Sequence, residues 1–156
     1  NIVDNSYTLI MGNEPAITPN TLIVSSNVRV ASIAEDEFDE RNLTKALKTS
    51  FPDNEVVQYT SDENIKKTVW EKLDACDRVL MYSYDACYDE IQQDLVNSLL
   101  KTDKEVYVIS IKGPIDKQHF EGLKNYSCVY EYTPNSIRTI IKQLKKEITL
   151  NGKLPQ

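Results

Sequence analysis

Residues 78–84 read Arg-Val-Leu-Met-Tyr-Ser-Tyr, and a helix-like run from Tyr88 to Lys101 follows them. A short apolar run of this kind is typical of a β-strand that is covered on both faces. The run after it carries apolar residues at helical spacing, namely Ile91, Leu95, Val96, Leu99 and Leu100. A buried strand that turns sharply into a helix is therefore the central unit of the fold. We expect any pocket near the far end of this strand, from Ser83 to Tyr88.

Most of the chain repeats this unit. Further strands are predicted at residues 21–25, 55–59, 105–111 and 127–132. Helices are predicted at 42–50, from a cap-like start at 60–63, at 115–123 and from 133 to about 148. Residues 5–11 are β-rich and fit either a short edge strand or an arm that enters the domain, and residues 26–38 are predicted to form a long loop. The alternation predicts the α/β class, as a three-layer α/β/α sandwich with a mainly parallel, Rossmann-like sheet.

The length of 156 residues suits one domain with a substantial core. We expect a single domain over residues 1–156, with an arm at 1–20, an α/β core at 21–148 and a tail at 149–156. The chain starts on a polar segment without Met and ends on Gly-Lys-Leu-Pro-Gln. These ends are those expected of a piece of a longer protein.

A net charge of −6 argues against a nucleic-acid partner, which favours a basic surface. The sequence has no basic amphipathic segment and no apolar run long enough to span a bilayer, so no membrane partner is expected. Three cysteines in no zinc-binding spacing predict that Cys76 and Cys128 are buried hydrophobic residues. Composition leaves the compartment open between the cytoplasm and a secreted or envelope location.

Ligands of open parallel sheets bind beyond the carboxyl ends of the strands, which selects the loops at 25–27, 83–88 and 112–116. The four glycines, at positions 12, 113, 122 and 152, form neither a dinucleotide-binding motif nor a P-loop. We therefore expect no nucleotide cofactor, and the sequence implies no other cofactor or metal.

The turn after the central strand allows two reactive arrangements. Cys87 stands where a nucleophile elbow would lie, and His119 is the only histidine that could serve it as a base. The bulky Tyr88 opposes such an elbow. Asp85, Asp89 and Glu90 could provide acid/base chemistry or bind a cation, but acidic residues at the start of a helix are also favoured by its dipole. We expect an unreactive thiol at Cys87. We expect the three carboxylates to be acidic residues that stabilise the start of a helix.

Several motifs in order carry a family resemblance. They are Gln93–Leu100, Lys104–Ser110, the turn Lys-Gly-Pro-Ile-Asp at 112–116, Tyr132–Ser136 before the last helix, Gly152–Pro155 at the end and Ser6–Ile10 at the start. Together they resemble the C-terminal α/β domain of glycoside hydrolase family 3, in particular that of the bacterial β-N-acetylglucosaminidases. That branch has an Arg-x-Pro-Tyr-Asp-like turn, which Pro114 and Asp116 match, whereas Lys112 and Ile115 replace the Arg and Tyr.

The resemblance implies that the chain is the C-terminal fragment of a larger enzyme, and an accessory domain rather than a catalytic one. In this family the aspartate nucleophile lies on an N-terminal barrel, and in this branch so does an Asp-His dyad. Neither role transfers to a residue of this chain. The implied partners are that barrel of the same protein and, through the parent enzyme, a carbohydrate such as an amino-sugar or peptidoglycan-derived glycan. Candidates that face the barrel or border the substrate mouth are Ser83, Tyr84, Asp85, Lys112 and Asp116. Two alternatives stay open, a stand-alone α/β binding or regulatory module and a small thiol enzyme that uses Cys87.

Overall fold

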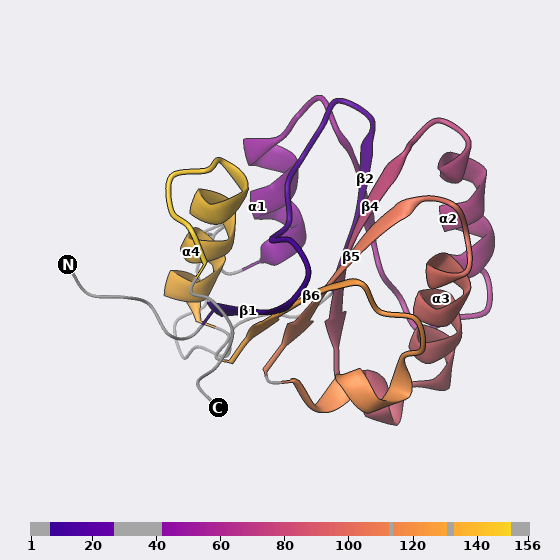
Figure 1. The fold of residues 1–156 in the computed structure, drawn as a ribbon. Helices are drawn as coiled ribbons and strands as arrows, with labels where there is room; N and C mark the ends of the chain where they lie inside the picture. The colour runs from indigo at the N-terminus through magenta and orange to yellow at the C-terminus, as the bar shows by residue number, and fades with distance from the viewer. Residues whose placement is uncertain (1–6, 27–41, 113, 131–132, 151–156) are drawn as a thin grey trace.

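The computed structural model describes residues 7–26, 42–112, 114–130 and 133–150 (Figure 1). Within these ranges, six strands form one sheet in the order β1-β6-β5-β4-β2-β3. The strands are β1 (Tyr7–Met11), β2 (Thr21–Ser25), β3 (Glu55–Gln58), β4 (Arg78–Tyr84), β5 (Glu105–Ile111) and β6 (Asn125–Val129). The helices are α1 (Leu43–Ser50), α2 (Ile65–Leu73), α3 (Glu90–Leu100) and α4 (Pro134–Leu144), with 3₁₀ turns η2 (Ala86–Tyr88) and η3 (Pro114–His119).

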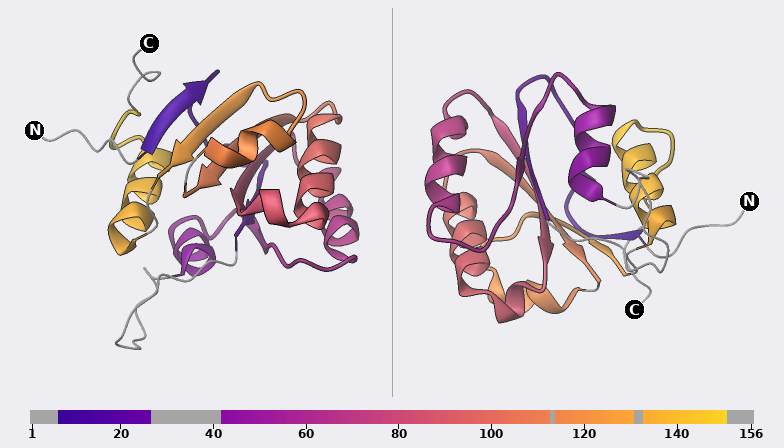
Figure 2. Two further views of the ribbon diagram at one scale, coloured as in Figure 1. Left: turned by 90° about the horizontal axis from the view of Figure 1, so that it is seen from below. Right: turned by 180° about the vertical axis from the view of Figure 1, so that it is seen from behind.

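The sheet is parallel apart from β1, which pairs antiparallel with β6 at one edge. Of the two alternatives for residues 5–11, the edge strand is thus the one observed over Tyr7–Met11. Helices α1 and α4 cover one face of the sheet, and α2 and α3 cover the other (Figures 1 and 2). The predicted three-layer α/β/α sandwich is confirmed.

The central strand β4 is buried because its side chains alternate between two cores. Val79 and Met81 pack with α2 and α3, whereas Leu80 and Tyr82 pack with α1 and α4. Strand β4 pairs with β2 on one side and with β5 along its whole length on the other. The bounds of β4 and β5 agree with those predicted, since an apolar run buried on both faces marks its own ends.

Other boundaries differ from the prediction, each for a reason that the structure shows. Strand β6 begins at Asn125, two residues earlier than predicted, and ends at Val129, which pairs with the last residue of β5, Ile111. Residues 131–132 of the predicted strand lie outside the described residues. Helix α4 ends at Leu144 rather than near residue 148. Lys146 there adopts φ 64°, and the Glu147 amide donates to the Lys142 carbonyl at 2.8 Å. This is the usual way for a left-handed residue to end a helix.

The start of α2 was predicted wrongly. The helix begins at Ile65, not at residues 60–63, and Asn64 at its N-cap makes no side-chain cap bond. The Asp62 carboxylate instead accepts hydrogen bonds from the Asn64 amide at 2.7 Å and the Thr60 hydroxyl at 3.0 Å. It thereby stabilises a turn ahead of the helix. Similarly, the helix after β4 begins at Glu90, after η2, and the segment predicted as a helix at 115–123 forms only η3.

The loop predicted at 26–38 lies outside the described residues, apart from Ser26. Cys76 and Cys128 are buried, as predicted. No described helix is long and apolar enough to cross a bilayer.

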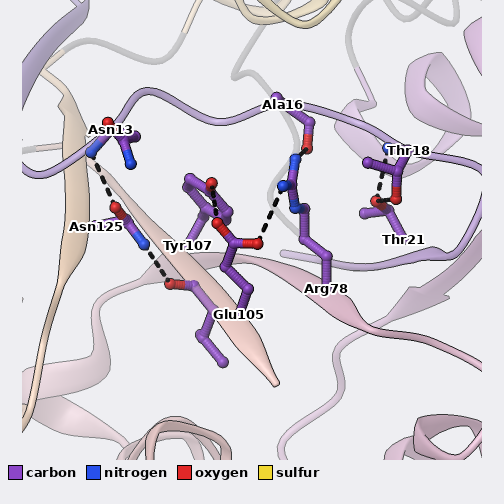
Figure 3. A network of polar contacts seen from close by, with 9 residues as sticks. Asn13, Ala16, Thr18, Thr21, Arg78, Glu105, Tyr107 and Asn125 are labelled. Carbon is purple, nitrogen blue, oxygen red and sulfur yellow. Dashed lines mark hydrogen bonds and ion pairs between the residues drawn. The ribbon is translucent and has the colours of Figure 1, made fainter. Parts of the chain in front are cut away.

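A network of polar contacts ties the segment between β1 and β2 to the amino edge of the sheet (Figure 3). Arg78 donates to the Ala16 carbonyl at 3.1 Å and to the Glu105 carboxylate at 3.0 Å, and its guanidinium lies 5.1 Å from the centre of the Tyr107 ring. The Tyr107 hydroxyl donates to the other oxygen of Glu105 at 2.7 Å. The charged side chains at this edge are therefore engaged in contacts that stabilise the fold. A ligand is expected at the opposite, carboxyl edge of the sheet.

Candidate functional site

The carboxyl edge of the sheet has a topological switch point between the neighbouring strands β2 and β4. The helix after β2, α1, lies on one face, and the helix after β4, α3, lies on the other. Connections that leave in opposite directions open a crevice, where ligands of such sheets bind. A cleft of about 450 Å³ lies at this place. It is lined by Ser26, Tyr59, Thr60, Ser61, Tyr84, Asp85, Tyr88, Asp89 and Gln92.

The turn after β4 forms one wall of this cleft. Asp85 is exposed and has φ 53°, which is the left-handed conformation that few residues other than Gly, Asn and Asp adopt readily. The turn continues as η2, which the Tyr88 amide closes by donating to the Asp85 carbonyl at 3.0 Å. Tyr88 is 85% exposed at the cleft, so its ring is available for contact with a ligand or another surface.

Asp89 joins the segments that line the cleft, because its two carboxylate oxygens accept hydrogen bonds from different elements. Its Oδ2 accepts from the Tyr59 hydroxyl at 2.7 Å, and its Oδ1 accepts from the Ser61 hydroxyl at 2.9 Å. Oδ1 also accepts from the Gln92 amide at 3.2 Å, which makes Asp89 the N-cap of α3. One carboxylate thus joins the loop after β3 to the start of α3.

These bonds set the ionisation of Asp89. Partial burial raises the pKa of its carboxyl, but the hydrogen bonds from Tyr59, from the Gln92 backbone and from Ser61 together lower the pKa below its ordinary value. Burial and the bond to Asp89 raise the pKa of the Tyr59 hydroxyl. Asp89 is therefore ionised and Tyr59 protonated at neutral pH. Asp89 suits a structural acceptor, not a general acid, which needs a raised pKa.

Gln92 fixes the wall of the cleft to the strand end. Its side-chain oxygen accepts from the Tyr84 amide and its side-chain nitrogen donates to the Tyr84 carbonyl, both at 2.9 Å. On the other side, the Ser26 hydroxyl donates to the Tyr82 carbonyl at 2.5 Å. Hydrogen bonds to the backbone of β4 thus hold Gln92 and Ser26, which line the cleft, in place.

The structure separates the site residues predicted from the sequence. Tyr84 and Asp85 line the cleft, whereas Ser83 is fully buried and faces the Ser110 hydroxyl at 3.4 Å. Lys112 is exposed, and its amine lies 5.8 Å from the centre of the Tyr84 ring, so it borders the same strand end. Asp116 belongs to η3, and its side chain lies outside the described part of the chain.

Sequence reasoning missed the contribution of β3. Tyr59, Thr60 and Ser61 follow this strand and line the cleft, and Gln92 adds to it from α3. The loop after β3 could have been selected by the same rule that selected the others, because it too leaves the carboxyl edge of the sheet. The cap-like residues 60–63 predict a helix start, and that prediction does not indicate the side chains that reach Asp89.

The thiol arrangement gains no support from the turn geometry. The left-handed residue that follows the strand is Asp85, whereas Cys87 lies half-buried within η2, two residues later. A nucleophile elbow would hold the reactive side chain at the strained residue itself. In the same way, the structure uses Asp89 as the cap of α3 and leaves Glu90 exposed in its first turn, as the helix-start interpretation predicts. No group of three or more His, Cys, Asp or Glu residues that could hold a metal occurs among the described residues.

Comparison with known proteins relates this fold to one group of enzymes. No protein-family model matches the sequence, and the comparison with curated proteins found no match. Among solved structures, the chain is similar to a glycoside hydrolase family 3 (GH3) β-N-acetylglucosaminidase from Paenibacillus sp. str. FPU-7, with a TM-score of 0.73 and 24% identity over 96% of this chain and 30% of that one.

Two further structures extend the relationship. One is a fungal multi-domain GH3 β-N-acetylglucosaminidase, with a TM-score of 0.67 and 19% identity over 96% of this chain and 17% of that one. The other is a β-glucosidase from Listeria innocua, with a TM-score of 0.66 and 13% identity over 90% of this chain and 23% of that one. The chain thus spans less than a third of the length of each of these structures. The resemblance read from the sequence is confirmed at the level of the fold: this chain has the fold of one part of the GH3 enzymes.

Proposed function

We propose that this chain is a non-catalytic accessory domain of a GH3 glycosidase whose parent enzyme hydrolyses β-linked N-acetylglucosamine or a related glycoside. The observation that carries the proposal is the coverage: almost all of this chain matches part of a GH3 β-N-acetylglucosaminidase, but only 30% of that protein. We infer that the remainder of the parent supplies a barrel with the catalytic groups. The present domain would pack against it and border the substrate mouth.

The cleft supports an accessory role. Retaining glycosidases need a nucleophile and an acid, held as two carboxyl groups about 5 Å apart. Here Asp89 accepts hydrogen bonds from three residues and has a lowered pKa, which opposes a role as the acid. The cleft offers hydroxyl groups, the exposed Tyr88 ring and the turn at Asp85, which suit contact with a sugar or a neighbouring domain. Within this proposal, Tyr84, Asp85, Lys112 and Asp116 face the barrel or the substrate mouth, and Ser83 supports them from inside the strand.

The proposal predicts that the purified chain does not hydrolyse para-nitrophenyl N-acetyl-β-D-glucosaminide. The measurement is release of nitrophenol against a buffer blank, with a complete GH3 β-N-acetylglucosaminidase as the positive control. Turnover by the pure chain that disappears in Asp89→Asn or Glu90→Gln, but persists in Asp85→Asn, would show that the domain is itself catalytic. A reading frame that encodes a barrel of roughly 250 residues upstream is also expected.

The cleft also favours a second candidate, a stand-alone ligand-binding module, because its lining residues are held in place by hydrogen bonds within this chain. This candidate predicts saturable binding of a small polar ligand by the chain without a partner domain. A titration followed by amide chemical shifts of Ser61, Tyr88 and Gln92 distinguishes the two. An upstream barrel in the same reading frame would count against a stand-alone module.

A further inference from the structure

A second hollow lies away from the carboxyl-edge cleft, on the face of the sheet that α1 and α4 cover. The two helices lie side by side there (Figures 1 and 2), and a groove of about 350 Å³ runs between them. Its lining combines apolar and charged side chains: Ala46, Thr49, Ser50, Ile137, Arg138, Ile141, Lys142, Lys145 and Glu147. Since α2 and α3 lie on the other side of the sheet, this surface is separate from the proposed substrate mouth.

The sequence of α4 sets an apolar row beside a basic row. Ile137 and Ile141 are four residues apart and therefore lie on one side of the helix. Ile137 is buried in the core, whereas Ile141 and, across the groove, Ala46 are only half-buried and form a floor that solvent reaches. One basic residue directly follows each isoleucine, and a third lies about one turn further along the chain. They are Arg138, Lys142 and Lys145, spaced as i, i+4 and i+7.

The charge of this surface is opposite to that of the whole protein. Helix α1 and residues 134–147 carry six cations and one acid, although the chain as a whole has a net charge of −6. A lysine near the end of each helix is favoured by the helix dipole. The dipole does not account for a row that extends back to Arg138 in the second turn of α4. Lys142 and Lys145 are exposed, and neither forms an ion pair with a described residue.

We propose that the α1–α4 groove docks an acidic amphipathic helix of a partner protein. Apolar side chains of that helix would cover Ala46 and Ile141, and its carboxylates would lie along the basic row. The eleven residues of α4 span about 16 Å, and the row from Arg138 to Lys145 spans about 10 Å. Glutamates at i, i+4 and i+7 of an aligned helix repeat this spacing, so two turns of a partner suffice. Helices laid into grooves between helices are a common mode of peptide recognition.

Two other anionic partners fit the surface less well. A nucleic acid offers phosphates but nothing to cover an apolar floor, and the acidic remainder of the chain repels it. An anionic bilayer needs a broad, convex apolar face that it can immerse, whereas this apolar surface is the narrow floor between two helices. A helix supplies both the apolar ridge and the regular row of carboxylates.

The test uses the whole chain and a labelled synthetic peptide with a leucine stripe flanked by glutamates at helical spacing. Comparison peptides carry lysine for each glutamate, or the same residues in scrambled order. The protein variants are Lys142→Glu with Lys145→Glu, and a matched control with Lys67→Glu and Lys101→Glu, which are exposed lysines on α2 and after α3. Fluorescence anisotropy measures binding, and amide chemical shifts of Ala46 and Ile141 locate it.

The expected result is saturable binding of the ordered acidic peptide, weakened about tenfold by the double reversal on α4 and little changed by the control reversal. Added salt should weaken it as well. The proposal is overturned if the scrambled or basic peptide binds as well, or if both double variants lose the same affinity. Absence of peptide binding together with Lys142- and Lys145-dependent binding of anionic vesicles or of single-stranded nucleic acid would likewise overturn it. Circular dichroism establishes that each variant is folded.

Discussion

At the scale of single residues, the Asp89 carboxylate organises the cleft by joining two elements. It caps α3 and holds the loop after β3 through the Tyr59 and Ser61 hydroxyls. Replacing it with Ala removes the cap and leaves donors unpaired. We expect Asp89→Ala to lower the free energy of unfolding at pH 7 by about 1–3 kcal/mol. Urea denaturation measures this loss, and Glu90→Ala, which is exposed and not the cap, is the matched control.

The same residue predicts a pH dependence whose sign follows from its lowered pKa. The unfolded state takes up the proton of Asp89 near the ordinary value of about 3.9, before the folded state does. The stabilising contribution of the carboxylate is therefore complete above that value and is lost as the pH falls through the lowered pKa. Denaturation of wild type and Asp89→Asn at several pH values should give a difference that shrinks in acid. A difference that grows in acid would contradict the lowered pKa.

At the scale of secondary-structure elements, the connection that leaves β1 depends on Gly12. Its φ of 71° is left-handed, and a Cβ at this position would meet the Lys124 carbonyl oxygen and the Asn125 side chain. The neighbouring Asn13 amide donates to that Asn125 side chain at 2.9 Å, which holds the connection against the start of β6. Backbone conformation and close approach thus both require a glycine.

Gly122 offers a matched comparison for this element. It also has positive φ, 85°, but a Cβ there would meet no atom within 4 Å. We expect Gly122→Ala to cost about 1 kcal/mol of unfolding free energy from conformation alone. Gly12→Ala should cost about 2 kcal/mol more, because β1 has to shift from β6. Thermal denaturation of the two variants measures the difference, and equal losses would show that the close contact is of no consequence.

At the scale of the whole molecule, the two cores share one sheet and should unfold together. Leu80 on β4 packs under α1 and α4, while Trp70 on α2 packs against the opposite core. We expect Leu80→Ala to lower the free energy of unfolding by about 2–5 kcal/mol. Trp70 fluorescence, which reports the far core, should shift to the same denaturant midpoint as far-ultraviolet circular dichroism. Separate midpoints for the two signals would show that the layers unfold independently.

The sequence determined the fold class because the apolar runs of β4 and β5 are continuous and alternate with helical spacing. Such runs bury on both faces and so predict a parallel sheet without knowledge of its strand order. Boundaries followed instead from contacts that hydrophobic spacing does not show. Strand β6 ends at Val129 because β5 ends opposite it, and α2 starts late because Asp62 is used in a turn. The pairing of β6 with β5 cannot be read from the local sequence, whereas the Asp62 turn joins residues only two positions apart.

In the cleft, the sequence predicted the turn after β4, including Tyr84 and Asp85, because ligands of such sheets bind beyond the carboxyl end of a central strand. Only the tertiary structure placed Tyr59 and Ser61 against Asp89, which is about 30 residues away along the chain. It also buried Ser83 and set α1 beside α4. Hydrophobic periodicity is a local property and can be read directly from the sequence. The meeting of distant hydroxyls around one carboxylate depends on strand order, which periodicity does not encode.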